Sequence, residues 1–315
     1  MKVELQPSSF DEFIGQSNVK NTIKTMIDSS LRQGINLDHM LFHGIPGTGK
    51  TSLAGIIANE LNRQIHYVQA SNLEKKSDLI TILTCLNEGD ILFIDEIHSL
   101  NSIIEESLYN AMEYFVFDLI IGVDASARTM RMNLKKFTLI GATTKFNMIS
   151  KPFKERFGYI ARFNNYTKKE LCKIIRNSAD KLQIKIKDEE ILQISSFSNF
   201  TPRIANNLLK RCNDFRISLN KDIIDQETVK ITFYNLDLYK LGLGKEHVDY
   251  LKMLRENFND KWVSLDTIAN LMSIPKENIL INIEPLLLMH GLLIKSSRGR
   301  KISSYGIDYL LDLKK

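Results

Sequence analysis

The segment HGIPGTGKTSLAGIIANEL, residues 43–61, decides how the first half of the chain is interpreted. Positions 44 to 51 match G-x-x-x-x-G-K-[ST] without a mismatch. In this pattern the glycines turn the backbone so that consecutive N–H groups point at phosphate oxygens. A short apolar segment precedes the motif and a helical pattern follows it, which is the context that a P-loop requires. The segment therefore predicts a nucleotide site.

Two residues of this motif and two carboxylates further on supply the expected chemistry. Lys50 is expected to reach the β- and γ-phosphates, and the hydroxyl of Thr51 is expected to bind Mg²⁺. In ILFIDEIH, residues 91–98, an apolar strand delivers Asp95 to its carboxyl end, where α/β folds bind ligands. We expect Asp95 to hold the metal and Glu96 to polarise the attacking water. This set favours ATP hydrolysis over a kinase reaction, because no acceptor hydroxyl has to be positioned.

Three further polar residues refine this hypothesis. Thr144 ends the strand TLIGATT, and its hydroxyl is expected to hold the same water. Arg156 lies in the polar segment SKPFKERFGYIARF. It either pairs locally with Glu155 or, in a ring-forming ATPase, projects into the site of a neighbouring subunit. Arg203 lies on the first turn of a helix, where the helix dipole disfavours a cation, and this favours a phosphate-reading role.

Composition and charge narrow the class of protein. The chain has 315 residues, of which 43% are hydrophobic and 25% charged, so it is long enough for two or three globular domains. Its net charge of +5 permits a nucleic-acid partner without indicating one. The three cysteines are far apart, which argues against a disulfide framework and fits a reducing cytosol. The start lacks the apolar core of a signal peptide, and no apolar run reaches the roughly 18 residues of a membrane helix, so we expect a cytoplasmic protein without membrane contact.

Short apolar segments alternate with amphipathic ones between residues 38 and 163. Four apolar segments lack the two-residue alternation of a half-exposed strand and are expected to be buried on both faces. They are HMLFHG, QIHYVQA, DILFIDE and KFTLIGATT. Helical patterns such as 51–61 and 79–86 lie between them, which predicts a parallel sheet wrapped by helices. We assign residues 1–166 to this P-loop α/β domain.

The strand pattern stops after Tyr166. Four segments with helical spacing predict a small all-α lid domain at residues 167–238. LGLGKEH, residues 241–247, is interpreted as a linker. Helical segments at 248–258, 265–272 and 276–283, with a break at Pro285, then precede two strands around a basic turn in GLLIKSSRGRKISSYG. This order predicts a C-terminal winged-helix domain at residues 239–315.

Several of these segments resemble the RuvB family of AAA+ Holliday-junction branch-migration ATPases. The likeness runs from FDEFIGQ to GLLIKSSRGR and includes DHMLFHGIPGTGKTSLAGIIANE, DILFIDEIHSLN, FTLIGATT, ERFG and FTPRIANNLLKRCNDF. Its most specific element, DLIIGVDASARTMRMNL at residues 118–134, resembles the hairpin with which this family engages RuvA. The resemblance implies a homohexameric, ATP-driven motor that moves duplex DNA in recombination and repair, with RuvA as partner and RuvC in the resolving complex.

The resemblance also implies roles for individual residues. Arg156 falls at the arginine-finger position, Thr144 at the first sensor and Arg203 at the second, while Lys295 and Arg300 fall at the DNA-contacting positions of the wing. The implied nucleotide pocket consists of Leu5, Gly47, Gly49, Lys50, Thr51, Ser52, Glu113, Tyr114, Phe115, Arg156, Tyr166 and Arg203. The basic residues between positions 295 and 301 suit phosphate binding, and a solvated turn is the alternative. The chain departs from the family pattern at Ile45, Gln6 and Lys154.

Two other functions fit parts of the sequence. A clamp-loader ATPase would share FDEFIGQ and the lid, but it would carry a helical collar in place of a basic wing and would lack the hairpin. A DNA-binding regulator that uses ATP only as a conformational signal would share the basic wing. An intact Glu96 argues against the regulator, and an ATP turnover assay separates the two.

Overall fold

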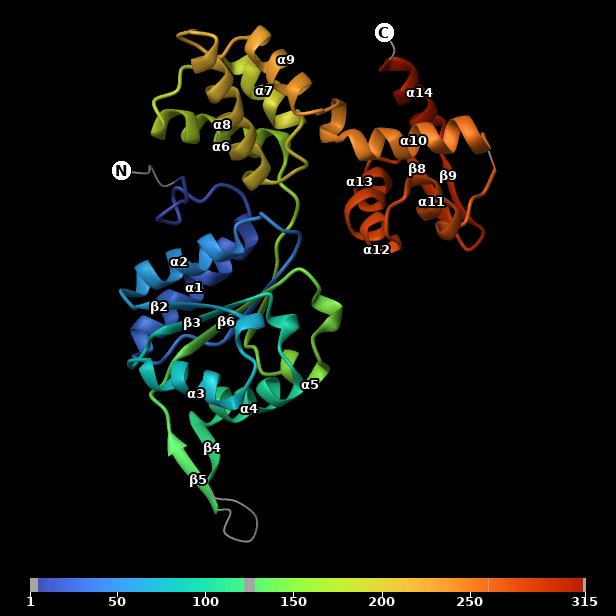
Figure 1. Cartoon of the computed structure of the whole chain (residues 1–315). Helices are drawn as coiled ribbons and strands as arrows, with labels where there is room; N and C mark the ends of the chain where they lie inside the picture. The colour runs from blue at the N-terminus through green and yellow to red at the C-terminus, as the bar shows by residue number, and fades with distance from the viewer. Residues whose placement is uncertain (1–4, 122–127, 260, 314–315) are drawn as a thin grey trace. The chain divides into compact units, whose positions relative to one another are not determined.

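The computed structural model describes residues 5–121, 128–259 and 261–313 (Figure 1). By its internal contacts the chain divides into two units. The first unit extends to Ile174 and includes Phe200–Arg203, and the second comprises Ile175–Asn199 and the chain from Ile204 onward. None of the described helices is long and apolar enough to cross a membrane.

A five-stranded sheet forms the centre of the first unit. Its order is β2-β3-β6-β1-β7, and every neighbouring pair is parallel, as predicted. The strands are β1 (Met40–His43), β2 (Ile65–Gln69), β3 (Ile91–Asp95), β6 (Thr138–Thr143) and β7 (Tyr159–Arg162). Because β6 lies between β1 and β3, the residue that follows β6 separates the P-loop from the predicted metal-binding carboxylate.

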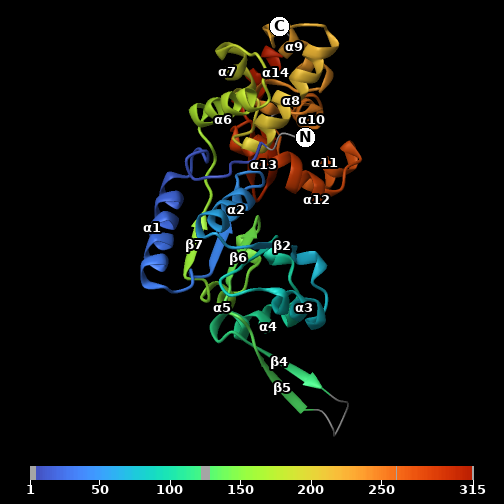
Figure 2. The same cartoon turned by 90° about the vertical axis from the view of Figure 1, so that its left-hand side faces the viewer.

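Helices cover both faces of this sheet (Figures 1 and 2). They are α1 (Ser17–Gln33), α2 (Lys50–Leu61), α3 (Lys76–Cys85), α4 (Ser102–Glu113) and the short α5 (Lys151–Lys154). Successive residues of β1 point to opposite faces, so Phe42 packs in the core with α1 and α2 while Leu41 packs in the core with α3 and α4. The predicted burial on both faces is wrong for β2, where Tyr67 is 56% exposed, because this edge strand pairs only with β3.

A hairpin interrupts the chain between α4 and β6 (Figure 1). Strands β4 (Val116–Ile121) and β5 (Arg128–Asn133) are antiparallel, and Val116 pairs with Asn133 at the base. The predicted hairpin is therefore confirmed for the described strands, and residues 122–127 of that segment lie outside the described residues. Two hydrogen bonds from Arg131 to Asp118, at 2.8 and 2.9 Å, join the strands across one face.

Four helices follow the sheet in sequence, as predicted. They are α6 (Lys168–Lys181), α7 (Asp188–Ser196), α8 (Pro202–Ser218) and α9 (Gln226–Asn235). The N-cap of α9 is Asp225, whose carboxylate accepts a hydrogen bond from the N–H of Thr228 at 2.8 Å. The segment interpreted as a linker does not behave as one. Leu243 is fully buried in a hydrophobic core with α10 (Lys245–Phe258). The linker interpretation of residues 241–247 is therefore wrong, because this segment belongs to the packed C-terminal part of the chain.

The C-terminal part has the elements of a winged helix. After α10 come α11 (Leu265–Met272), α12 (Lys276–Asn278), α13 (Glu284–Met289), β8 (Leu293–Ser296), β9 (Gly299–Ile302) and α14 (Ser304–Asp312). The helical segment breaks near Pro285 as predicted, and a π-helical turn, Ile279–Ile283, precedes α13. Helix α14 was not predicted. Val263 pairs with Arg300 of β9 in a single antiparallel bridge.

Candidate nucleotide-binding site

The P-loop connects β1 to α2 at the carboxyl edge of the sheet. Gly47 and Gly49 have φ of 80° and 99°, which side-chain-bearing residues rarely adopt. A Cβ on Gly49 would also lie 2.9 Å from the ring of Phe13. Within the described chain, the N–H groups of Gly47, Thr48 and Gly49 donate no hydrogen bond to the protein. These unused donors at a helix N-terminus fit the phosphates of a nucleotide.

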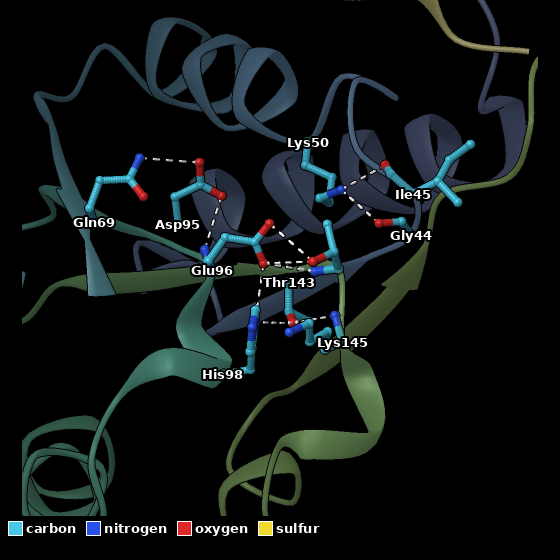
Figure 3. A network of polar contacts seen from close by, with 10 residues as sticks. Gly44, Ile45, Lys50, Gln69, Asp95, Glu96, His98, Thr143 and Lys145 are labelled. Carbon is cyan, nitrogen blue, oxygen red and sulfur yellow. Dashed lines mark hydrogen bonds and ion pairs between the residues drawn. The ribbon is translucent and has the colours of Figure 1, made fainter. Parts of the chain in front are cut away.

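Lys50 is the buried cation of this loop. Its Nζ donates hydrogen bonds to the carbonyl oxygens of Gly44 and Ile45, at 2.9 and 3.0 Å (Figure 3). Burial lowers the pKa of the Lys50 ammonium, and the charges of Glu96 and Asp95 act against this shift. The side chain is therefore held at the loop, facing the two carboxylates that the sequence predicted.

Asp95 is the last residue of β3, and Glu96 follows it. The N–H of Glu96 donates to Oδ1 of Asp95 at 3.0 Å, and Nε2 of Gln69 donates to Oδ2 at 3.4 Å (Figure 3). Glu96 has φ 47° and ψ 47°, a left-handed conformation that costs free energy in a glutamate and is characteristic of functional sites.

Three donors surround the carboxylate of Glu96. The N–H of Thr144 donates to Oε2 at 3.0 Å and its hydroxyl donates to the same oxygen at 2.9 Å. Nδ1 of the half-buried His98 lies 3.1 Å from Oε2 and 3.0 Å from Oγ1 of Thr143 (Figure 3). Because a carboxylate only accepts, this geometry favours the tautomer with a proton on Nδ1. Thr144, predicted to hold the water, thus holds the glutamate here.

Tyr166 and Arg203 lie against the P-loop. The hydroxyl of the buried Tyr166 donates a hydrogen bond of 3.0 Å to the carbonyl oxygen of Thr48 and so helps to fix the backbone of the P-loop. A Cβ on Gly47 would lie 2.9 Å from Cβ of Arg203, which places this arginine beside the phosphate-binding turn. The charge of Arg203 also acts to lower the pKa of Lys50, which is consistent with a shared anionic ligand.

Another group of predicted pocket residues lies at the opposite edge of the sheet. The carbonyl oxygen of Met112 lies 3.0 Å from Nε2 of His39, the residue before β1 begins. Glu113, Tyr114 and Phe115 follow Met112 directly. Strands of four or five residues separate this edge from the P-loop by about 13–16 Å. One copy of the chain therefore does not bring these residues to its own P-loop.

Arg156 belongs to this second group. It precedes β7, and its Nη2 lies 3.8 Å from a carboxylate oxygen of Glu113. Its guanidinium lies 4.1 Å from the ring centre of Tyr109, and its buried Nε has no hydrogen-bond partner in the described structure. The alternative pairing with Glu155 is wrong, because Glu155 lies 3.8 Å from Nζ of Lys151 instead.

Three predicted ligands remain: Thr51, Ser52 and Leu5. Thr51 and Ser52 lie on the first turn of α2, at the same edge of the sheet as Asp95. A hydroxyl and one carboxylate fit Mg²⁺, which usually takes its other ligands from phosphate and water. Among the described residues no group of three metal-binding side chains occurs. Leu5 is half-buried, and no hydrogen bond is found between it and the P-loop.

Sequence reasoning missed three residues of the site: Phe13, Gln69 and His98. The only available signal was the histidine of DEIH, which follows Glu96 by two positions. Phe13 and Gln69 lie on segments that meet the site only in the folded chain, so no local pattern marks them.

The two predicted DNA contacts share one carboxylate in the C-terminal hairpin. Nζ of Lys295 lies 2.9 Å from Oε2 of Glu284, and Nε of Arg300 lies 2.5 Å from Oε1. The Glu284 side chain is 1% exposed. Each of the two cations therefore has a carboxylate partner in the winged helix.

Three family models and close relatives match the chain. The models are the Holliday junction DNA helicase RuvB P-loop domain at residues 5–163, the RuvB AAA lid domain at 166–239 and the RuvB C-terminal winged helix domain at 240–311. The Holliday junction branch migration complex subunit RuvB of Mycoplasmopsis synoviae is 56% identical and covers 97% of each chain. The corresponding subunit of Campylobacter hominis is 43% identical, covering 98% of this chain and 91% of its own.

A solved structure agrees with the sequence relatives. The RuvB Holliday junction branch migration motor of Thermotoga maritima superimposes with a TM-score of 0.84 at 37% identity, covering 98% of both chains. The sheet order, the lid helices and the winged helix described above are thus the architecture of a known AAA+ ATPase. Together with the matched family models, this shows that the chain belongs to the RuvB family.

Proposed function

We propose that this chain is the ATP-hydrolysing motor subunit that drives branch migration of Holliday junctions. The observation that carries the proposal is the P-loop edge of the sheet. Unused N–H donors, the buried Lys50 and the pair Asp95 and Glu96 meet there in a chain whose relatives are named as branch-migration subunits. The clamp-loader alternative is not favoured by these relatives.

In this proposal the P-loop residues bind ATP and Mg²⁺. The N–H groups of residues 47–49 and the ammonium of Lys50 would neutralise the phosphate oxygens. Thr51 and Asp95 would hold Mg²⁺, which supplies charge neutralisation of the transferred phosphoryl group. Arg203, beside Gly47, adds a second cation to the same edge.

Glu96 is the group that we assign to the attacking water. The donors from Thr144 and His98 orient its carboxylate, so the proton acceptor is fixed before ATP arrives. Orientation of a catalytic base by neighbouring hydrogen bonds reduces the reorganisation that the reaction requires. Thr144 thus acts through Glu96 in this structure.

A second copy of the chain completes the site. Arg156 and Glu113 lie about a strand's length from the P-loop of their own chain, so they can serve only a neighbour's nucleotide. We therefore propose that Arg156 is an arginine finger in trans, in a ring of six copies as the family resemblance implies.

The partners proposed are duplex DNA and RuvA. The winged-helix elements would bind DNA, and the β4–β5 hairpin would bind RuvA. The test is ATP hydrolysis by the purified chain alone, with a four-way junction, and with junction plus RuvA, beside strand separation of a labelled junction. Activity that rises with both additions and is lost in Lys50→Ala supports the proposal. The proposal is overturned if the rate of ATP hydrolysis does not change when DNA and RuvA are added and no branch migration occurs.

A further inference from the structure

The residues that hold Arg156 in place lie on one face of α4. Glu105, Tyr109 and Glu113 are spaced four residues apart along this helix, so their side chains share a face. Each of the three contacts the segment 150–156, which carries Arg156 at its end. This face of α4 therefore supports the segment from its first residue to its last.

Tyr109 contacts the charge of Arg156 directly. The guanidinium carbon lies 4.1 Å from the centre of the Tyr109 ring, a distance at which the negative face of an aromatic ring attracts a cation. The same ring packs against the buried ring of Phe153, with 5.7 Å between the ring centres. Tyr109 thus contacts both the guanidinium and the helix α5 that precedes it.

The hydroxyl end of Tyr109 is fixed by hydrogen bonds. It donates to Oε1 of Glu105 at 2.6 Å and lies 3.2 Å from Oγ of Ser150. Burial and the hydrogen bond to Glu105 both raise the pKa of this hydroxyl, so it stays protonated at neutral pH. Ser150 also donates to Glu105, and it caps α5 by accepting a hydrogen bond from the N–H of Phe153 at 3.2 Å. One carboxylate therefore fixes both the ring and the start of α5.

The other contacts of Arg156 leave one end of its guanidinium free. Nη1 donates to the carbonyl oxygen of Pro152 at 2.8 Å, and the backbone N–H donates to that of Phe153 at 3.2 Å. Nη2 lies 3.8 Å from Glu113, which is too long for a hydrogen bond. Within the described residues Nη2 donates no hydrogen bond, so its N–H groups remain available to an anion.

We propose that Tyr109 is a positioning residue for Arg156. Its ring, fixed through Glu105 and Ser150, holds the guanidinium so that Nη2 meets the terminal phosphate of the nucleotide in a neighbouring copy. This inference rests on the proposed function, because it assumes that Arg156 acts in trans. A long arginine side chain loses conformational entropy when it is fixed, and the ring fixes it before the neighbour binds ATP.

A cycle of substitutions in Tyr109 and Arg156 tests this role. Hydrolysis of radiolabelled ATP by the full chain is measured with a four-way junction and RuvA. Tyr109→Leu removes the aromatic face and should lower kcat by about 5–30-fold, with little change in KM because the P-loop is intact. In a chain that already carries Arg156→Ala, the same substitution should have no further effect, because the charge that the ring supports is absent.

Two further variants separate the aromatic face from general packing. Tyr109→Phe keeps the ring and loses only the hydroxyl, so its kcat should lie between those of the original chain and Tyr109→Leu. The matched control is Tyr67→Leu, because Tyr67 also packs against a phenylalanine, with 5.6 Å between its ring centre and that of Phe93. It lies on β2, at the edge of the sheet opposite to β7, and its substitution should leave kcat unchanged.

Thermal unfolding followed by circular dichroism verifies that each variant is folded. Should Tyr109→Leu not fold, Tyr109→Phe is carried through the same cycle, with an expected loss in kcat of about 2–5-fold when Arg156 is intact. A loss that occurs only when Arg156 is intact supports the positioning role.

The other outcomes distinguish this inference from the proposed function. If Arg156→Ala hydrolyses ATP at the normal rate, Arg156 does not act in trans, and the role of Tyr109 is overturned with it. If Arg156→Ala is defective but Tyr109→Leu has a normal kcat, only the role of Tyr109 is wrong. The same holds if Tyr109→Leu lowers kcat by an equal factor with and without Arg156, because the ring then serves the fold alone.

Discussion

The carboxylate of Glu96 accepts hydrogen bonds from both the N–H and the hydroxyl of Thr144, at 3.0 and 2.9 Å. The two residues follow neighbouring strands, β3 and β6, so the sheet itself sets the position of the proposed base. Because β1 lies on the other side of β6, the same register also places this carboxylate near Lys50.

Substitution of Glu96 by glutamine should separate ATP binding from hydrolysis. The amide keeps the shape of the side chain but does not accept a proton from water, so turnover should fall by about 10²–10⁴-fold. Binding of a fluorescent ATP analogue and release of inorganic phosphate measure the two steps. Normal turnover would show that another residue activates the water.

Replacing Lys50 by alanine should abolish nucleotide binding or hydrolysis while the chain stays folded. The substitution removes the buried positive charge that would neutralise the γ-phosphate. The fold should survive, because the only hydrogen bonds lost are those from Nζ to the carbonyl oxygens of Gly44 and Ile45. Circular dichroism and a nucleotide-binding titration test this together. Near-normal hydrolysis would contradict the P-loop assignment.

His98 should act on the rate through Glu96. Loss of a hydrogen bond to a charged group costs about 1.5–3 kcal/mol, so His98→Leu should lower kcat by about 10–100-fold with little change in KM. His98→Asn is the matched control, because its Nδ2 occupies the place of Nδ1 and restores the donor. Equal loss in both variants would mean that His98 serves packing alone.

Arg156 should act in a neighbouring subunit. An Arg156→Ala subunit keeps its own P-loop and should bind ATP, but its hydrolysis should fall by a factor on the order of 10³–10⁵. Mixing it with Lys50→Ala subunits creates some interfaces with an intact P-loop and an intact arginine. Activity of the mixture should exceed that of either variant alone, with co-assembly checked by size-exclusion chromatography. An inactive mixed assembly would argue that Arg156 serves only its own chain, through Glu113 and Tyr109.

Glu284 should make the winged helix sensitive to acid. Its pKa is lower in the folded state than in the unfolded chain, so its stabilisation is fully present above the unfolded pKa of about 4.3 and is lost as the pH falls through the folded pKa. Glu284→Ala leaves Arg300 without its buried partner and should cost about 3–5 kcal/mol at neutral pH. Urea unfolding followed by Trp262 fluorescence at pH 7 and below measures both effects. An alanine variant as stable as the original chain would exclude this role.

The P-loop and the strand that ends at Asp95 have local signals, and both were predicted correctly. The P-loop is one continuous strand, turn and helix, and the φ values of Gly47 and Gly49 explain why glycine occurs there. Asp95 ends the buried strand β3 and Glu96 follows it, and parallel strands place their carboxyl ends at one edge of the sheet. The position of Lys50 and of the two carboxylates at this edge could therefore be predicted from spacing alone.

Contacts between distant segments were decided only by the tertiary structure. The sequence shows Lys295 and Arg300 only as members of a basic segment, but the two-residue period of the hairpin turns both toward Glu284. Arg156 and Glu113 are far apart in sequence and meet because α4 and the start of β7 reach the same edge of the sheet. A motif reflects conformational and chemical requirements within a few consecutive residues. The partner of a side chain, in contrast, depends on strand register and on how the layers of the fold pack.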